Sequence, residues 1–505
     1  MTQKVLAPRA KGGCSLEAAE HVEVDVDQVA LVRAPAQALG AAVAAGLKKT
    51  SVEVAVAYDG TCVTMAPPVA GGASARAAGL TSETRAVASD LLARGVLVAR
   101  AGVGFPAPVH LERFASPARL CVTDEPRLAG LGGIGMLTLV VPTASLARAL
   151  AGGTVAVRRP VSLQVLLTGR LRPFVCARDV GFELLRRGLG DVVRRVERAR
   201  GAPVVVEIAG TGVRGLSVAE RAVIASVAPQ VGAAAVVFTS DERTEVFLRD
   251  QRRSKAHRAL HADAGAPIEE VLTIDLGAVD PLLLDENGAV RAVRDLAGRP
   301  LGQVLLGGDT GVTLRDLFAA ATLLKSKRVP QRLDFLVAVP SRQMLEVLSA
   351  AGALTDLVAT GARLVEPDAR VLTGEMYAPP AGVASMRTFD PDATGNGSAP
   401  GARAEHALTA SAETIAYGVA TGAIGDPRSF KRPVRITLPR ALPTDDVLVA
   451  RKPDRTAGPG TAAARPRDAK DSAAPLAHAH APGDRREART RTPGGEGRVA
   501  TQRGG

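Results

Sequence analysis

The sequence contains no tryptophan and few other aromatic residues, with 10 phenylalanines and 3 tyrosines among 505 residues. Aromatic side chains usually supply much of the area buried in a core, so the cores here must be built mainly from alanine, valine and leucine. Hydrophobic residues make up 46% of the chain. That share excludes a largely disordered polypeptide and leaves room for roughly two to four globular domains.

Cysteine is also scarce. The four cysteines, at positions 14, 62, 121 and 176, form no Cys-x-x-Cys pair and no disulfide framework, which suits the reducing cytoplasm. The N-terminal stretch MTQKVLAPRAKGG lacks the apolar core of a signal peptide, and the longest uncharged run, residues 128–147, is interrupted by GLGGIG and Pro142. We therefore expect a soluble, cytoplasmic protein without a membrane span.

The positive charge, +12 overall at pH 7, is concentrated near the C-terminal end. Residues 451–505 contain 12 Lys/Arg and 6 Asp/Glu, and so carry half of the net charge. Leu476 and Val499 are the only larger aliphatic residues of this segment, too few to offset the entropy of ordering it, so we expect a disordered basic tail. Such a tail can bind polyanions weakly and with salt dependence, although the same composition also occurs without function.

Between residues 1 and 450, short apolar stretches alternate with stretches of helical period. The apolar stretches end in Gly, Asp or Ser, as buried strands do; they include SVEVAVAYDG, VSLQVLLTG, PVVVEIAG, AAAVVFTSD and RLDFLVAVPS. The helical stretches include ARDVGFELLRRG, SVAERAVIASVAPQV, LRDLFAAATLLKSK and SRQMLEVLSAAGALTDLVATG. The alternation predicts the α/β class in several lobes, with boundaries near residues 158–160 and 275–300.

The stretch QVLLGGDTGVTLRDLFAAATLLKSKR, residues 303–328, predicts a strand, a tight turn and a helix. Thr313 and Asp316 form a variant of the capping box at the start of this helix, as Ser217 and Glu220 do for another. Backbone amides at a helix start attract anions, and open α/β sheets bind ligands at the carboxyl ends of their strands. The loop is therefore a candidate site, although it lacks the Gly-Lys-Ser/Thr of a Walker loop and an ordinary turn remains the alternative.

Ten stretches carry a resemblance to a known family. In chain order they are PVHLERFASPARL, GLGGIGML, LTGRLRPFVCARDV, FELLRRG, GVRGLSVAERAVI, VFTSDERTEVFL, LKSKRV, VPSRQMLEVLSAAGALTDLVATGARLVEP, APPAGVASMRTF and VATGAIGDPRSF. Together they resemble the large subunit of the aconitase, homoaconitase and isopropylmalate dehydratase superfamily over roughly residues 1–450. The resemblance implies three α/β/α lobes, residues 1–158, 159–275 and 276–450, around a cleft.

In the family, the cleft holds a [4Fe–4S] cluster and catalyses the dehydration and rehydration of hydroxy di- or tricarboxylic acids. The family's fourth, swivelling domain would have to follow residue 450, where only the expected tail stands. The resemblance therefore implies that this domain is a separate small subunit, which would be a partner, or that it is absent.

The resemblance also assigns the positions of the cluster ligands. Residues 307–311, Gly-Gly-Asp-Thr-Gly, stand where the family has Gly-Ser-Cys-Thr-Asn, so Asp309 replaces the first ligand. The family's Cys-x-x-Cys pair falls on Ala369 and Leu372. Cluster iron needs soft thiolates, which an alanine, a leucine and a carboxylate cannot replace. We therefore predict that the chain holds no [4Fe–4S] cluster and no other cofactor.

Some catalytic positions keep a carboxylate. The family's Asp-Ser-His aligns with Glu125, Pro126 and Arg127, an earlier Asp-His pair aligns with Asp59 and Gly60, and its active-site glutamate aligns with Glu207. We take Glu207, Asp59 and Glu125 as remnant catalytic positions.

The groups that bind substrate in the family are mostly replaced. The His-Gln ahead of VHLERF becomes Ala107 and Pro108, and Pro391 and Asn396 stand where arginines grip substrate carboxylates. We take Arg127, Asp309, Thr310 and Asn396 as the residues of the cleft. His110 matches a residue without a direct catalytic role and is expected to be structural.

The loss of thiolates, histidines and arginines while the packing segments persist favours a cofactor-free scaffold or regulatory paralogue. Two alternatives stay open. One is an active hydro-lyase that holds Mg²⁺ or Mn²⁺ through Asp309, Glu125, Asp59 and Glu207. The other is a polyanion- or RNA-binding protein. An ion pair of Arg127 with Asp309 or Glu125 would instead fill the position of the cluster.

Overall fold

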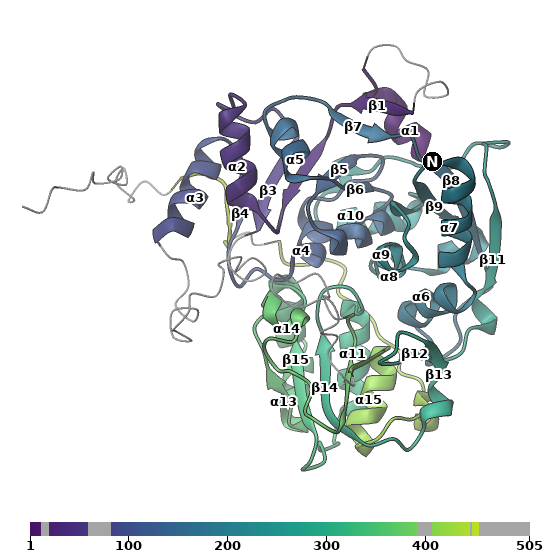
Figure 1. Ribbon diagram of the computed structural model, residues 1–505. Helices are drawn as coiled ribbons and strands as arrows, with labels where there is room; N and C mark the ends of the chain where they lie inside the picture. Colours follow the sequence, from purple (N-terminus) through teal and green to yellow (C-terminus); the bar gives the residue numbers. More distant parts are fainter. Residues whose placement is uncertain (12–19, 59–81, 391–406, 445–446, 454–505) are drawn as a thin grey trace, which may run out of the picture. The chain divides into compact units, whose positions relative to one another are not determined.

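The computed structural model describes residues 1–11, 20–58, 82–390, 407–444 and 447–453. Met1–Ala457 form one compact unit, and the strands that the structure describes fall into four sheets (Figure 1). Residues 454–505, and with them nearly all of the expected tail, lie outside the described residues, as do Asp59 and Asn396. The division into three lobes stays a prediction, although each of the three larger sheets takes most of its strands from one predicted lobe.

The first large sheet has six strands in the order β19-β4-β3-β2-β5-β6, all parallel except β19. Its strands are β2 (Gln28–Leu31), β3 (Val54–Tyr58), β4 (Leu97–Ala99), β5 (Leu120–Thr123), β6 (Leu137–Val140) and β19 (Val449–Ala450). Strand β19 belongs by sequence to the predicted third lobe, but it pairs antiparallel with β4 of the first sheet.

The other elements of this part of the chain include a small antiparallel sheet of β1 and β7. Their bounds are β1 (His21–Val24), β7 (Val155–Arg158), α1 (Thr2–Leu6), α2 (Pro35–Ala44), α3 (Ser82–Ala93), α4 (Pro106–Arg113), α5 (Thr143–Leu150) and the 3₁₀ helices η1 (Ala7–Arg9) and η2 (Pro126–Ile134). The uncharged run at 128–147 thus folds as a 3₁₀ helix, a strand and the start of a helix. None of the described helices is both long and apolar enough to span a membrane.

The second sheet has four parallel strands in the order β10-β9-β8-β11. Its elements are β8 (Val161–Thr168), α6 (Ala177–Arg186), α7 (Leu189–Arg200), β9 (Val204–Ala209), η3 (Thr211–Gly215), α8 (Val218–Ala225), α9 (Ala228–Val231), β10 (Ala235–Phe238), α10 (Glu242–Asp250), η4 (Ser254–Ala256), β11 (Val271–Asp275) and η5 (Leu276–Ala278). The stretch SVAERAVIASVAPQV, predicted as one helix, forms α8 and α9 instead. Pro229 lacks the amide and clashes with the carbonyl four residues earlier, so α8 ends at Ala225.

The third sheet has seven strands in the order β13-β12-β18-β17-β14-β15-β16, parallel from β18 to β16. Its elements are β12 (Leu282–Leu284), β13 (Val290–Ala292), η6 (Val293–Leu296), β14 (Leu301–Gly307), α11 (Leu314–Leu324), β15 (Asp334–Ala338), α12 (Arg342–Ala350), α13 (Ala353–Thr360), β16 (Arg363–Leu364), α14 (Ala369–Thr373), β17 (Ala384–Arg387), β18 (Ala407–Ala410), α15 (Ala412–Thr421) and η7 (Pro427–Phe430). Helices α11 and α15 pack against each other beside this sheet (Figure 1). Strand β14 lies between β17 and β15, so the loop that follows it leaves the sheet away from either edge.

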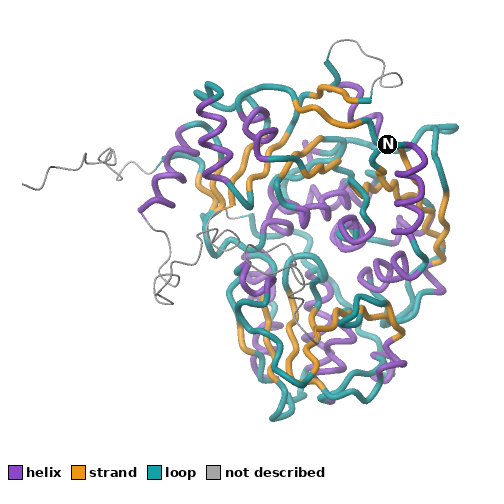
Figure 2. The backbone as a smooth tube through the Cα atoms, viewed as in Figure 1, coloured by secondary structure: helices purple, strands orange, loops and turns teal. Residues whose placement is uncertain are grey.

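The packing follows the composition. The cores of all three large sheets consist mainly of alanine, valine and leucine, as predicted, between the strands and helices coloured in Figure 2. Both predicted capping boxes form: Ser217 Oγ accepts from the Glu220 amide at 3.3 Å, and Thr313 Oγ1 accepts from the Asp316 amide at 3.2 Å. The α/β class and the starts of α8 and α11 are therefore as expected from the sequence.

Candidate functional site

The loop after β14 turns tightly against the segment that follows β17. Gly307 and Gly308 have φ angles of +122° and +79°, which favour glycine. A Cβ at Gly307 would stand 1.8 Å from the carbonyl oxygen of Ala338, and one at Gly308 would stand 2.3 Å from the ring of Phe389. The backbone therefore approaches its neighbours as closely as it can, and the next residue, Asp309, is held in a fixed place.

Asp309 is neutralised by an arginine from another part of the chain. Arg127, in η2, places Nε 2.5 Å from Oδ2 and Nη2 2.5 Å from Oδ1 of Asp309, a bidentate pair. Nη2 also donates to the carbonyl oxygen of Asp390 at 3.0 Å. The side chains of Arg127 and Asp309 are 13% and 3% exposed. The pairing of these two residues, one of the arrangements expected from the sequence, is present.

Glu125 lies beside this pair. Its Oε1 caps η2 by accepting from the Arg127 amide at 2.9 Å, and it also accepts from Arg33 Nη2 at 2.9 Å. Burial raises the pKa of Glu125, and the attraction of Arg33 opposes that rise. The structure thus brings Glu125, Arg127 and Asp309 together, as expected for remnants of one site.

Glu207 is engaged elsewhere. On β9, its carboxylate accepts from the amino group of Met1 at 2.9 and 2.8 Å, from the amide and hydroxyl of Thr2 at 2.8 Å each, and from Ser162 Oγ at 3.0 Å. Burial acts to raise the pKa of Glu207, but the hydrogen bonds from Met1 and Thr2 outweigh it and hold the pKa below its usual value. None of these partners belongs to the Arg127–Asp309 pair.

The expected divalent-metal site does not form among the described residues. Glu125, Glu207 and Asp309 are not part of any group of three potential ligands that converge there, and the fourth proposed ligand, Asp59, lies outside the described residues. The reason is that each of the three carboxylates has partners of its own. Glu125, Glu207 and Asp309 therefore do not converge on one point among the described residues, and a site that includes Asp59 stays a prediction.

The other two ligand positions assigned by the resemblance offer no metal donor. Ala369 begins α14, and Leu372, 4% exposed, packs in an apolar cluster with Phe389 and Leu336. Phe389 is also the ring against which Gly308 lies, so the loop and Leu372 adjoin one side chain. Cys121 and Cys176, the cysteines that the structure describes, are buried free thiols on β5 and at the start of α6. This set of side chains does not fit a [4Fe–4S] cluster, which needs several thiolates.

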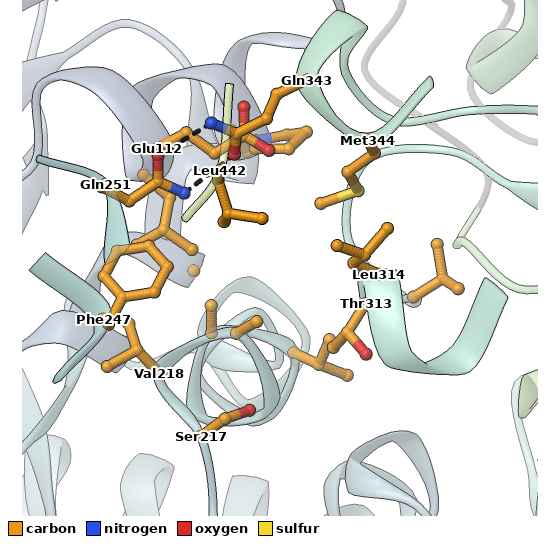
Figure 3. A pocket seen from close by; sticks show the side chains of 18 of the residues that line it. Glu112, Ser217, Val218, Phe247, Gln251, Thr313, Leu314, Gln343, Met344 and Leu442 are labelled. Carbon is orange, nitrogen blue, oxygen red and sulfur yellow. Dashed lines mark hydrogen bonds between the residues drawn. The ribbon is translucent and has the colours of Figure 1, made fainter. Parts of the chain in front are cut away.

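A cavity of about 210 Å³ opens beside the ion pair (Figure 3). Arg127, Asp309 and Thr310, three of the residues predicted for the cleft, line it. So do Ala107 and Pro108, which replace the family's His-Gln. The structure therefore gathers the predicted cleft residues that it describes around one cavity.

Most of the remaining wall is apolar. Figure 3 shows Val218 and Phe247 on one side of the cavity and Leu314 and Met344 on the other, with Leu442 at one end. Asp309 takes up the Nε–Nη2 edge of the Arg127 guanidinium, so that edge is not offered to a ligand carboxylate. The cavity is suited to a compact and largely apolar molecule.

Several polar residues of the wall, among them Glu112, Gln251 and Gln343, were not predicted from the sequence; Ser226, Arg243 and Asp250 are others. Gln251 and Gln343 exchange amide hydrogen bonds of 2.8 and 2.9 Å. Glu112 accepts from Ser341 Oγ at 2.7 Å, and burial raises the pKa of Glu112 to about 7. Glu112, Gln251 and Gln343 lie on or just beyond helices at spacings that do not distinguish a cavity wall from a solvated face, so the sequence held no signal for them.

His110 is fully buried and neutral. Its Nδ1 lies 2.9 Å from Tyr58 Oη and its Nε2 lies 3.0 Å from Gln28 Oε1, so Nε2 carries the proton and Nδ1 accepts from tyrosine. Burial lowers the pKa of His110 to about 3. The position agrees with the structural role expected for it.

The chain is similar to known proteins of one family. A family model described as the aconitase family (aconitate hydratase) matches residues 82–294. The 3-isopropylmalate dehydratase large subunit 2 of Archaeoglobus fulgidus is 28% identical over 333 residues, which are 65% of this chain and 77% of the relative. The large subunit 1 of Thermotoga maritima is 26% identical over 66% of this chain and 79% of its own length, and that of Deinococcus radiodurans is 28% identical over 73% and 80%.

Among solved structures, aconitase X of Thermococcus kodakaraensis in its holo-form covers 72% of this chain and 83% of its own, with 10% identity and a TM-score of 0.41. The ordered motifs, the α/β architecture, the family match and the dehydratase relatives agree: the chain belongs to the superfamily of aconitase and 3-isopropylmalate dehydratase large subunits.

Proposed function

We propose that this protein is a cluster-free member of its superfamily that has lost hydro-lyase chemistry and acts in the cytoplasm as a scaffold or regulatory subunit. The observation that carries the proposal is the ion pair between Arg127 and Asp309, which neutralises the side chain at the first ligand position. Leu372, at another ligand position, is committed to apolar packing. The free thiols of Cys121 and Cys176 suit a reducing compartment.

The walls of the cavity support the same conclusion. A hydroxy di- or tricarboxylic acid would have to give up the hydration of its charges on entering, and fixed cations would have to replace that hydration. Arg127 is engaged by Asp309, and Val218, Phe247 and Met344 supply no polar group. The other arginine of the lining, Arg243, donates through Nε to the carbonyl oxygen of Arg214. Dehydration also needs an acid that takes up the leaving hydroxyl, a role that iron plays in the family. The side chains at the ligand positions cannot hold such an ion through thiolates.

The test is the iron and acid-labile sulfide content of the full-length chain, purified without oxygen and then treated with iron and sulfide under reconstituting conditions. We expect neither element above the level of a Cys121→Ser/Cys176→Ser variant, and no absorbance of an iron–sulfur cluster. Stoichiometric iron and sulfide in the wild-type chain would overturn the proposal. In that case, assays of hydration and dehydration of hydroxy di- and tricarboxylic acids would follow.

We further propose a small swivel-domain subunit as the partner. The support is that the relatives of this chain are themselves named large subunits. The test is to co-express the chain with a small-subunit homologue from the same source and to measure the mass of the product by size-exclusion chromatography with light scattering. A one-to-one complex is expected. Two separate species at micromolar concentration would count against the partnership without touching the iron and sulfide result.

A further inference from the structure

A second group of potential ligands lies at the starts of three helices, apart from the Arg127–Asp309 pair. Cys176 is the N-cap of α6, Asp316 lies in the first turn of α11, and Glu413 lies in the first turn of α15. One donor atom of each residue, the sulfur and two carboxylate oxygens, lies within 4.8 Å of the other two. The residues are 2%, 2% and 4% exposed.

One of the potential ligand residues has a side-chain oxygen without a hydrogen-bond partner. Glu413 Oε2 is buried and has no hydrogen-bond partner among the described residues. A buried carboxylate oxygen without a partner is costly, because it has left water and gained nothing in return.

Acidic groups also outnumber cations here. Asp179, fully buried in the first turn of α6, adds a third carboxyl to those of Asp316 and Glu413. Among the described residues, Arg315 is the cation in contact with this group, at 3.3 Å from Asp316 Oδ1 and 3.5 Å from Glu413 Oε1. Both distances exceed the roughly 2.7–2.9 Å of a strong charged hydrogen bond, and the arginine side chain is 37% exposed. Arg315 therefore compensates the group only in part.

The potential ligands are held in place by neighbours. Asp316 Oδ2 accepts from the amide and the hydroxyl of Thr313 at 2.9 and 2.8 Å, which leaves Oδ1 on the side of Arg315. The two oxygens of Asp179 accept from the amides of Cys176 and Leu282 at 2.9 Å each, so Asp179 fixes the backbone of the cysteine rather than offering a free donor. Such outer contacts orient metal ligands in known sites.

We propose that Cys176, Asp316 and Glu413 bind one divalent transition-metal ion of the zinc type. A sulfur donor disfavours Mg²⁺ and Ca²⁺, whereas Zn²⁺ and Co²⁺ accept one thiolate together with carboxylate oxygens. A four-coordinate ion would take its last donor from a second carboxylate oxygen. The ion would release the thiol proton of Cys176 on binding and would link α6, which follows the second sheet's first strand, to α11 and α15 of the third.

The site differs from the cluster position in residues and in chemistry. It uses one thiolate and no inorganic sulfide, so its occupation is independent of whether the proposed loss of the iron–sulfur cluster is correct. Its role would be structural, because the three donors are buried and do not line the cavity of Figure 3.

The first experiment measures metal in the full-length chain produced once with added Zn²⁺ and once with added Co²⁺. We expect close to one ion per chain by elemental analysis, without acid-labile sulfide. The cobalt form should show a thiolate-to-cobalt charge-transfer band in the near ultraviolet. A chain that carries no zinc or cobalt after both preparations would overturn the proposal.

Variants decide whether the ion sits at this site. Cys176→Ser should abolish the charge-transfer band, while the matched change of the other described buried thiol, Cys121→Ser, should leave it intact. Glu413→Gln keeps the thiol and the shape, and it should lower the metal content at least tenfold, as loss of a ligand does. It also serves if the serine variant fails to fold, as judged by circular dichroism.

Arg315→Gln removes the competing cation and should tighten cobalt binding. A band that survives Cys176→Ser, or metal content unchanged by Glu413→Gln, would place the ion elsewhere and overturn the assignment.

Discussion

Asp309 and Asp316 stand seven residues apart on one loop and helix, and their side chains are each 3% exposed, yet their surroundings differ. Asp309 meets the planar fork of Arg127 at 2.5 Å on both oxygens. Asp316 meets Thr313 and, loosely, Arg315, in a group that also contains Glu413 and its unpartnered oxygen. The charge of Asp309 is balanced by Arg127, whereas Asp316 belongs to a group with more acidic than basic side chains.

Asp309 and Asp316 lie in the same loop and helix, so it is the residues packed against them from other elements that determine how each buried charge is balanced. Arg127 comes from η2, 182 residues before Asp309, whereas Cys176 and Glu413 reach Asp316 from α6 and α15. The position that the resemblance assigns to a cluster ligand is therefore closed by an ion pair. Asp316, to which the resemblance assigns no ligand role, lies in a group that still has potential metal donors.

The largest effect is expected from breaking the compensated pair. Arg127→Met leaves the buried carboxylate of Asp309 without its counter-charge, which should cost about 3–5 kcal/mol of unfolding free energy. Arg127→Met/Asp309→Asn removes both charges and should recover most of that loss. Urea unfolding of the two variants measures both values. A double variant no more stable than Arg127→Met would mean that the loss comes from packing rather than from charge.

Leu372, at another of the ligand positions, tests apolar packing, because the stability of the fold should depend on the volume of its side chain. Leu372 is 4% exposed and packs with Phe389, so Leu372→Ala should cost about 2–5 kcal/mol through lost contacts and a cavity. Leu364, 48% exposed on β16, is the matched control, and its change to alanine should cost well under about 1 kcal/mol. If the two variants lose equal stability in urea, Leu372 is not the packing residue described here.

Glu112 allows a third test, because this buried carboxyl has a hydroxyl partner and no arginine fork. Its pKa is raised to about 7, so the folded protein holds a proton that the unfolded chain releases near 4.5. The stability due to this group is therefore complete below about pH 4.5 and is lost as pH rises through 7, on the order of 3 kcal/mol in total. The stability difference between wild type and Glu112→Gln should fall across that range.

The contribution of His110 to the pH dependence of stability has the opposite sign. Its folded pKa of about 3 lies below the ordinary 6.5, so its contribution is complete above pH 6.5 and is lost as pH falls toward 3. Between about pH 4.5 and 6.5 the two slopes oppose each other. Glu112→Gln should therefore unmask a steeper rise of stability with pH in that window. A flat difference between the two proteins would show that Glu112 does not titrate as described.

Much of the fold could be read from local signals. Apolar runs ending in Gly, Asp or Ser predicted the strands β3, β8, β9, β10, β14 and β15, and the side chains of Ser217 and Thr313 marked the starts of two helices. These features depend on residues close in sequence. The split into α8 and α9 was missed, although Pro229 carries the physical reason for it.

The site was less accessible to sequence reasoning. The pairing of Arg127 with Asp309 was foreseen as one of two arrangements, because the resemblance placed both at one cleft. The placement of Glu207 beside Met1 and Thr2 was not, since no local pattern records a contact between residues 206 positions apart. The group around Cys176 was missed for the same reason: its members come from three helix starts, and the thiol had been taken only as a buried apolar residue.

The smallest effect separates capping from support of the group around Asp316. Ser217→Ala and Thr313→Ala each remove a capping box in which the hydroxyl donates to the acid three residues later at 2.8 Å. Loss of the cap alone should cost about 1 kcal/mol in both. Asp316 is buried, whereas Glu220 is half-buried, so Thr313→Ala also leaves a buried carboxylate with fewer donors and should cost about 1 kcal/mol more. It should also weaken cobalt binding about tenfold, which Ser217→Ala should leave unchanged. Equal losses in both readouts would mean that Thr313 caps α11 and does nothing for the three ligands.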